Sequence, residues 1–243
     1  MRVAVAVVVF FVACVHADEA EDRAADAVKD LRGRIGRDDK AKEHPVIAVD
    51  LRSTEVGNND LKVLSAFKHL QLLDLGNTDV SDKGLKHLSG LKTLQILDLG
   101  VTKVSDKGLK DVGEIKSLQS LNLSLTEVTD KGLKDLKALE NLKLLNLQFT
   151  DVTDTGVKEL RGLKSLQTLI LNETKVTNAC VADLRELKEL QKLDLSNTKV
   201  SDACVKDLVE LKNLRSLNVE FTQVTEKGLQ ELRKAFPKAA IIP

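Results

Sequence analysis

The sequence predicts a single α/β solenoid, in which a parallel sheet runs along one side of a coil and short helices run along the other. Three observations predict it: a 24-residue period, two hydrophobic spacings inside each period, and an apolar content that is almost entirely aliphatic. The 243 residues are 42% hydrophobic, yet they include no Trp, no Tyr and only six Phe. The 37 basic and 37 acidic residues balance, so nucleic acid is not an expected partner.

Residues 1–17 form the pattern of a secretory signal peptide. Arg2 precedes an uncharged run over residues 3–15, and we expect export with cleavage near Ala17. About 13 apolar residues fall short of the roughly 20 that span a bilayer, so we expect contact with a membrane only through this signal. A lipoprotein signal acylated at Cys14 is an alternative, although the Leu expected before such a cysteine is missing.

Residues 18–45 are expected to close the N-terminal end of the solenoid, because a repeat stack exposes a cross-section of its core at each end. Residues 19–35 can form an amphipathic helix, and this capping helix would carry Ala24, Val28, Leu31 and Ile35 along one side. Residues 36–43 are then expected to be a charged connector.

Residues 46–237 hold eight 24-residue units without an insertion or a deletion. Val follows two residues after a recurrent Thr in every unit; the Thr positions are 54, 78, 102, 126, 150, 174, 198 and 222. In the unit that begins at Leu94, Leu97 and Leu99 alternate as in a strand. Leu109, Val112 and Ile115 recur at three-residue spacing, as on one face of a short helix.

The start of each predicted helix is also marked. Ser105 is a good N-cap, and Asp106 places negative charge in the first turn, where the helix dipole favours it. Ser or Thr fills the capping position in seven units, whereas the first unit has Gly57.

The pattern LxxLxLxxTxV followed by [ST]DxGLxxL resembles the leucine-rich repeat over residues 46–237. It is most similar to the cysteine-containing and ribonuclease-inhibitor-like variants and to exported repeat proteins of planctomycete-type bacteria. The resemblance implies a right-handed horseshoe or arc with a concave parallel sheet and convex helices. The usual ladder residue, Asn or Cys, is Thr in every unit. Its hydroxyl is expected to bond the backbone of the neighbouring turn, at about 1 kcal/mol net.

Residues 238–243 are expected to form the C-terminal cap. Phe236 fits a final partial turn, and Ile241 occupies the strand position of Leu217 one period earlier. Residues 18–243 are therefore predicted to be one domain.

No set of residues points to catalysis, a metal or a cofactor, so none of these is assigned. The four histidines, at positions 16, 44, 69 and 87, lack the spacing of metal ligands. The glycines at 84, 108, 132, 156 and 228 occur once per turn, which indicates close packing of helix against sheet and not a phosphate loop. The chain is therefore predicted not to be an enzyme.

Cys180 and Cys204 replace that glycine in two successive turns. Adjacent turns lie roughly 5 Å apart, which is close to the Cα separation of a disulfide. Parallel Cβ vectors disfavour the bridge, so two buried thiols are the simpler interpretation. A disulfide stays an alternative in an exported protein.

The solvent-facing strand positions offer one candidate binding surface. The middle position is Asp or Asn in seven of eight units, and Asp50, Asp74 and Asp98 form an acidic track. It could receive a basic partner or a divalent cation. A solvated polar row that keeps the sheet soluble is the alternative.

A position that follows each strand offers a second candidate binding surface. It is apolar on three consecutive turns, at Val101, Leu125 and Phe149, and again at Phe221, but polar in the other four units. With Ile96 and Leu144, these residues predict an exposed apolar patch of the kind found at interfaces. Packing along the loop edge is the alternative.

Together these features predict an exported repeat protein that binds another protein through its concave sheet. A structural role in the envelope without a discrete ligand is the first alternative. A hydrolase that uses the concave-face carboxylates is the more distant one.

Overall fold

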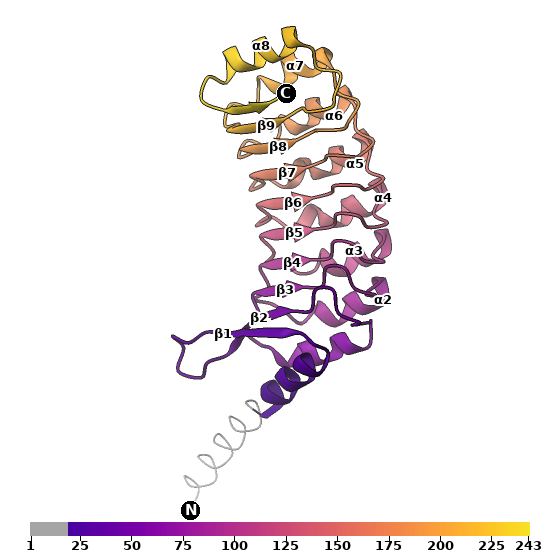
Figure 1. Cartoon of the computed structure of the whole chain (residues 1–243), viewed down its shortest axis with the longest axis vertical. Helices are drawn as coiled ribbons and strands as arrows, with labels where there is room; N and C mark the ends of the chain where they lie inside the picture. Colours follow the sequence, from indigo (N-terminus) through magenta and orange to yellow (C-terminus); the bar gives the residue numbers. More distant parts are fainter. Residues whose placement is uncertain (1–18) are drawn as a thin grey trace, which may run out of the picture.

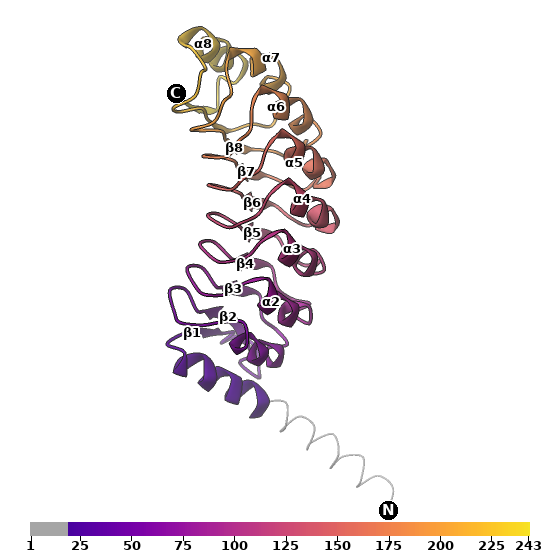
Figure 2. The ribbon, with the colours of Figure 1, turned by 90° about the vertical axis from the view of Figure 1, so that its right-hand side faces the viewer.

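The computed structural model describes residues 19–243, which stack into one gently curved solenoid (Figures 1 and 2). Strands line the concave side and helices line the convex side, as the resemblance implies. The signal peptide predicted over residues 1–17, with Cys14, lies outside the described residues. No helix within residues 19–243 is long and apolar enough to cross a membrane.

Over residues 19–243, ten strands form one sheet in chain order. They are β1 (Arg34–Arg37), β2 (Val46–Asp50), β3 (Leu72–Asp74), β4 (Ile96–Asp98), β5 (Ser120–Asn122), β6 (Leu144–Asn146), β7 (Thr168–Ile170), β8 (Lys192–Asp194), β9 (Ser216–Asn218) and β10 (Ala240–Ile242). The strands from β2 onward are parallel, and each residue pairs with its counterpart one period later, so that Leu73 lies beside Leu97 and Leu97 beside Leu121. The sequence period is therefore the structural period.

Short helices return the chain from one strand to the next. The α-helices are α2 (Asp82–Leu85), α3 (Asp106–Val112), α4 (Asp130–Leu133), α5 (Asp154–Glu159), α6 (Asn178–Leu184), α7 (Val205–Leu208) and α8 (Glu226–Ala235). The 3-10 helices are η1 (Asp60–Ala66), η2 (Lys86–Leu88), η3 (Lys134–Ala138), η4 (Leu160–Gly162) and η5 (Asp202–Cys204).

The core is one continuous aliphatic column that runs from Ala24 to Phe236. Each turn contributes residues from its strand, its bend and its helix; in the third turn Leu97, Leu99, Val104, Leu109, Val112 and Ile115 are all almost completely buried. Burying such a side chain stabilises the fold by about 1.5–3 kcal/mol, so each turn depends on its neighbours for burial.

The N-terminal cap differs from its prediction. Residues 19–30 are helical, but the helix does not reach Ile35, and residues 36–43 are not only a connector. Arg32 takes a φ of 61°, which ends the helix. Gly33 follows because a Cβ there would approach Leu51 to 2.7 Å. Ile35 then lies in β1, opposite Val49 of β2 in an antiparallel pair.

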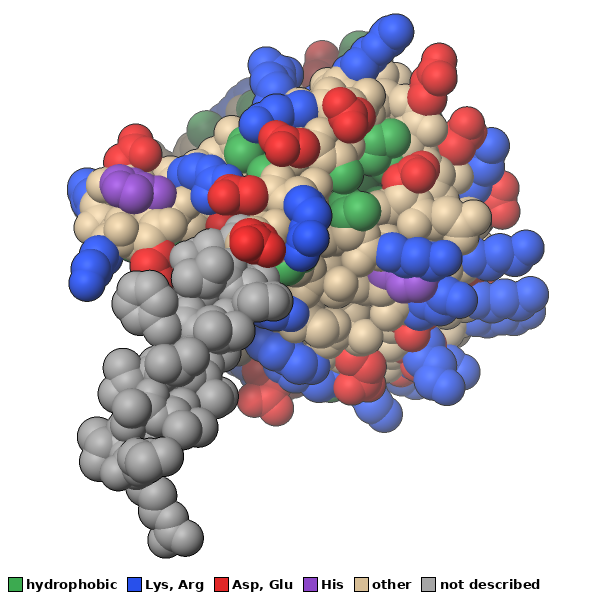
Figure 3. Space-filling view, turned by 90° about the horizontal axis from the view of Figure 1, so that it is seen from below, with side chains coloured by type: hydrophobic (Ala, Val, Ile, Leu, Met, Phe, Trp, Pro, Cys, Tyr) green, Lys and Arg blue, Asp and Glu red, His purple; other side chains and the backbone are tan. Residues whose placement is uncertain are grey.

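Arg37 fastens this cap. Its guanidinium donates to Glu21 and Asp22 of the helix, at 3.4 and 2.7 Å, and to the carbonyl of His44 at 3.0 Å. Glu21 also accepts from the Val46 N–H, at 2.8 Å, where the first parallel strand begins. Seen from the N-terminal end, basic and acidic side chains stand around a small apolar area (Figure 3).

A ladder of hydrogen bonds joins the helix starts of successive turns. Asp106, for example, accepts from both the N–H and the hydroxyl of Thr129, each at 2.7 Å. We call this set the capping ladder; its acceptors are Asn58, Asp82, Asp106, Asp130, Asp154, Asn178 and Asp202, and its donors are Ser81, Ser105, Thr129, Thr153, Thr177, Ser201 and Thr225.

The predicted cap at Ser105 is confirmed, because its hydroxyl accepts from the Lys107 N–H. That hydroxyl also donates to Asp82 of the preceding turn at 2.7 Å. The aspartate in each first turn therefore does more than meet the helix dipole, since it holds the next turn in place.

The packing predicted for the recurrent glycines was wrong in its partner. Their neighbours are ladder residues of the preceding turn and not the sheet: a Cβ on Gly132 would lie 2.7 Å from a carboxylate oxygen of Asp106 and 2.9 Å from its Cα. Cys180 and Cys204 occupy this position in later turns, and both are buried and unlinked. Burial raises the pKa of the Cys204 thiol to about 11.

The bond predicted for the recurrent Thr was also wrong. Its hydroxyl donates within its own turn, as from Thr102 to the Leu99 carbonyl at 2.6 Å, and not to the neighbouring turn. The same contact recurs from Thr54 to Thr222. The Thr column therefore closes each bend after a strand, and the capping ladder provides side-chain bonds between turns.

At the C-terminal end, α8 covers the last turn. Phe236 is buried, and β10 adds a final parallel strand in which Ile241 pairs with Leu217, at the register that its sequence position predicts.

Candidate functional site

The third residue after each of the strands β2 to β9 adopts a left-handed backbone, so this conformation recurs in all eight turns. The φ values lie between 53° and 58° at Ser53, Asn77, Val101, Leu125, Phe149, Glu173, Asn197 and Phe221, which we call the left-handed column. Asn suits this conformation, whereas a β-branched or bulky residue is an outlier there. The backbone of the solenoid demands it at every turn, so the side chain is where the turns differ.

Three consecutive members of this column form an apolar ridge: Val101, Leu125 and Phe149. These residues are 48%, 51% and 46% exposed, so about half of the surface of each one faces solvent. Each also carries a backbone cost of roughly 1–2 kcal/mol for the left-handed conformation. Stability of this chain alone gives no reason for apolar residues here.

The other predicted apolar residues lie at different distances from the ridge. Ile96 of β4 is 43% exposed and belongs to the same turn as Val101. Leu144 of β6 belongs to the turn of Phe149 and is half-buried. Phe221 is the most exposed of these side chains, at 73%, but it lies three turns beyond Phe149. The structure thus brings five of the six predicted apolar residues into three adjacent turns.

The acidic track is engaged by this chain's own groups. Each carboxylate accepts the N–H two residues on, as Asp74 does from Gly76 at 2.8 Å and Asp98 from Gly100 at 2.8 Å. Asp50 accepts from Arg52 at 3.0 Å. These bonds close the turn at the end of each strand, and Asn122 and Asn146 make the same bond in later turns.

Two arginines, which the predicted acidic track did not include, offset part of its negative charge. Arg34 pairs with Asp50 at 3.0 Å, and Arg52 reaches Asp74 at 3.5 Å and Asp98 at 3.4 Å. Arg52 crosses Gly76, whose missing side chain leaves it room. Glycine at positions 76 and 100, beside an arginine in the same column, was the sequence signal for this arrangement.

Electrostatics within the track are mixed. Burial raises the pKa of Asp74, and the nearby Asp98 raises it further, while the Gly76 N–H and Arg52 oppose the rise. Within residues 19–243, no group of three or more His, Cys, Asp or Glu side chains could hold a metal ion.

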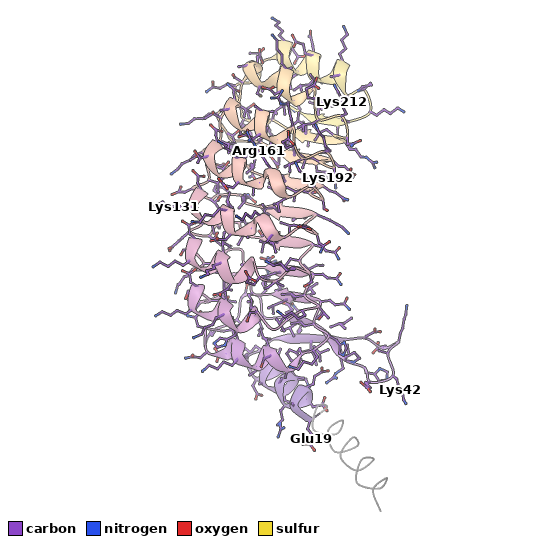
Figure 4. All side chains as sticks on the ribbon, turned by 180° about the vertical axis from the view of Figure 1, so that it is seen from behind. Glu19, Lys42, Lys131, Arg161, Lys192 and Lys212 are labelled. Carbon is purple, nitrogen blue, oxygen red and sulfur yellow. The ribbon has the colours of Figure 1, made fainter. Side chains whose placement is uncertain are left out.

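Along the stack, the concave face changes character. The first three turns carry the Arg52 network, and the third to fifth carry the apolar ridge. Farther on, Lys192 of β8 is exposed on the strand side, whereas Lys131 projects from the helical side (Figure 4). Two hollows of about 360 and 350 Å³ lie elsewhere, against the N-terminal cap, and both are lined by Glu43, Pro45 and His69.

A family model described as a leucine-rich repeat region matches residues 46–224. A search of curated proteins found no match.

Solved structures share the fold. Internalin C2 from Listeria monocytogenes is 24% identical over 86% of this chain and 88% of that chain, with a TM-score of 0.64. The ectodomain of the plant receptor kinase GASSHO1/SCHENGEN3 from Arabidopsis thaliana, solved in complex with CASPARIAN STRIP INTEGRITY FACTOR 2, is 19% identical over 82% of this chain and 24% of that chain, with a TM-score of 0.57. A leucine-rich repeat protein of Leptospira interrogans is 23% identical over 74% and 62%, with a TM-score of 0.50. At these identities the likeness is one of fold.

Proposed function

Because this chain belongs to the leucine-rich repeat family, we propose that it is an exported protein-binding module whose partner contacts the concave face and the apolar ridge at its edge. The ridge is the observation that carries the proposal. Val101, Leu125 and Phe149 combine an unfavourable backbone conformation with half-exposed apolar side chains. A second molecule that buries these side chains would offset both the strained backbone and the exposed apolar surface.

Comparison within the column supports this interpretation. Asn77 and Asn197 occupy the same backbone conformation and meet its preference. Three of the four apolar members are clustered on adjacent turns and include an aromatic residue, Phe149, of the kind that anchors interfaces. A contiguous apolar group of this sort is typical of the centre of a binding surface.

Affinity capture with a matched variant tests the binding surface. The bait is the protein, the source is the organism that makes it, and the comparison bait carries Val101→Asn, Leu125→Asn and Phe149→Asn, which we call the ridge variant. We expect a foreign protein in stoichiometric amount with the unmodified bait and its loss with the ridge variant. A Ser53→Asn bait, which introduces the same residue into the same column, should retain it.

Two results would contradict the proposal. Recovery of this chain alone would favour an assembly of solenoids without a discrete ligand. Equal capture by the ridge variant would place the contact elsewhere on the molecule.

Export is supported by the pattern of residues 1–17. N-terminal sequencing of the protein isolated from the medium or the cell envelope should begin at Asp18. A chain that keeps Met1, or that stays with the cytoplasmic fraction, would be evidence against export.

A further inference from the structure

We infer that the partner presents an amphipathic α-helix, which lies along the apolar ridge parallel to the axis of the solenoid and places a basic residue against Glu127. The inference rests on the proposed function, because it specifies the partner of the same ridge. Three features of the ridge lead to it: its spacing, its surroundings and its charge.

The spacing of the ridge is fixed by the backbone. The N–H groups of Val101, Leu125 and Phe149 donate to carbonyls of the next turn, at 2.8, 2.9 and 3.2 Å. The left-handed column therefore continues the hydrogen-bonded ladder of the sheet, and its members keep the separation of neighbouring strands, about 4.8 Å. Two steps along the ridge cover roughly 9.6 Å.

This spacing matches a helix better than an extended chain. An α-helix presents a side chain on one face about every 5.4 Å, so two turns cover about 10.8 Å. An extended chain presents one on the same face only about every 6.7 Å, so two steps cover roughly 13.4 Å. The helical mismatch of about 1 Å lies within the reach of side-chain rotamers, whereas the extended mismatch of about 4 Å is close to a whole turn of the solenoid.

The surroundings let a helix approach. On the sheet side, the residues directly before Val101 and Leu125 are Gly100 and Ser124, which are small and buried. The ridge therefore stands clear of its neighbours on that side at Val101 and Leu125, whereas the larger, half-buried Gln148 precedes Phe149. Its conformation is also set before binding, so little ordering entropy would be lost on association.

The charges beside the ridge indicate that the partner helix carries a basic residue. The exposed column two residues beyond the ridge contains Lys103, Glu127 and Asp151. Lys103 pairs with Asp79 at 2.6 Å and Asp151 with Lys175 at 2.7 Å. Within residues 19–243, Glu127 makes no ion pair; it is exposed and follows the central ridge residue, Leu125, by two positions. A basic side chain on the partner helix would complete the row.

Selection from an unbiased library of random 20-residue peptides tests the inference while the natural partner is still unidentified. The immobilised target is the protein, and counter-selection uses the ridge variant. We expect ridge-dependent peptides in which apolar residues recur at i, i+3 or i+4, and i+7, with Lys or Arg beside them. A synthetic peptide of the consensus should become helical on binding, as measured by circular dichroism, and should lose at least tenfold in affinity on Phe149→Asn.

The remaining outcomes separate this inference from the proposed function. Ridge-dependent peptides with alternating apolar residues and no induced helicity would overturn the helix and keep the ridge as a binding surface. Peptides that ignore the ridge variant but respond to changes at Ile96 or Leu144 would overturn the ridge and keep the concave face. Selection that yields no peptide sensitive to either set counts against both.

A charge variant tests the basic residue separately. Glu127→Lys should weaken the consensus peptide about fivefold to tenfold at low salt, with a smaller effect at high salt, because added salt screens the repulsion. Ser53→Asn is the matched control and should bind as the unmodified protein does. An unchanged affinity for Glu127→Lys would remove the basic residue from the inference.

Discussion

The capping ladder and the left-handed column are both repeated in every turn, but they treat sequence in opposite ways. In the ladder, the backbone and the side chains repeat together, since a short Asp or Asn always meets a Ser or Thr of the next turn. In the left-handed column, only the backbone repeats, while the side chain ranges from Ser53 to Phe221. Positions that join turns tolerate little variation, and positions that only face outward are open to use by a partner.

The difference also separates stability from function. A ladder residue such as Asp106 satisfies two donors of the next turn. The side chain of a ridge residue such as Phe149 makes no hydrogen bond within the chain, and the residue adopts an unfavourable left-handed backbone. Substitutions in the capping ladder and in the ridge should therefore change the free energy of unfolding in opposite directions.

The largest expected change in the free energy of unfolding comes from a substitution in the capping ladder. Asp106→Ala leaves the Thr129 N–H and hydroxyl without their acceptor, so we expect a loss of about 2–3 kcal/mol in the free energy of unfolding. Urea unfolding followed by circular dichroism measures it. Asp106→Asn is the control, because Asn178 bonds the same two groups of Ser201, accepting from its N–H and donating to its hydroxyl. It should cost less than about 1 kcal/mol. Equal losses for the two variants would mean that the ladder depends on charge and not on geometry.

Substitutions in the ridge should change the free energy of unfolding less, and in the opposite direction. Together, the three substitutions of the ridge variant should leave the free energy of unfolding unchanged or raise it by about 1 kcal/mol, because Asn tolerates the left-handed backbone. Val104→Asn is the control: it places the same residue in the same turn at a fully buried position, where we expect a loss of about 3 kcal/mol or more. A comparable loss in the ridge variant would show that the ridge packs in solution, and the binding proposal would lose its main support.

Much of the architecture could be predicted from sequence, because the same strand and helix pattern recurs in every 24-residue unit. The ladder was missed because the separation of Asp106 and Thr129 is one residue less than the period, and the two meet only after the turns stack. A signal existed nonetheless. The residue after the capping position is Asp or Asn in every turn whose ladder partner follows. In the last turn it is Glu226, whose side chain pairs with Arg233 instead.

Non-periodic parts were harder to predict, for a different reason. Ile35 fits both a helical and a strand pattern, and only the close approach at Gly33 decides between them. At the candidate site, the apolar residues of the ridge could be named from sequence. Their left-handed backbone could not, because no glycine marks the column; Asn77 and Asn197 are its only familiar sign.

The smallest expected effect compares one carboxylate of the concave face with one of the ladder, and it is read from pH dependence. Burial and the neighbouring Asp98 raise the pKa of Asp74 above 3.8, so its ionisation costs stability as the pH rises from 3.8 through the raised value. Hydrogen bonds from Thr225 lower the pKa of Asp202 below 3.8, so its ionisation adds stability, which is lost as the pH falls through the lowered value.

Asp74→Asn and Asp202→Ala should therefore shift stability in opposite directions near neutral pH. Asn at position 74 can still accept the Gly76 N–H, as Asn122 accepts from Ser124, and this variant should be more stable than the unmodified protein. Its advantage should close as the pH falls to 3.8, because Asp74 then becomes neutral as well. Asp202→Ala should be less stable near neutrality, and its deficit should close only below 3.8. Urea unfolding across this range measures both gaps. If the gap for Asp74→Asn stayed constant with pH, or if that variant were the less stable one near neutrality, Arg52 would outweigh burial at the acidic track. The concave carboxylates would then belong with the ladder, as groups that hold the solenoid together.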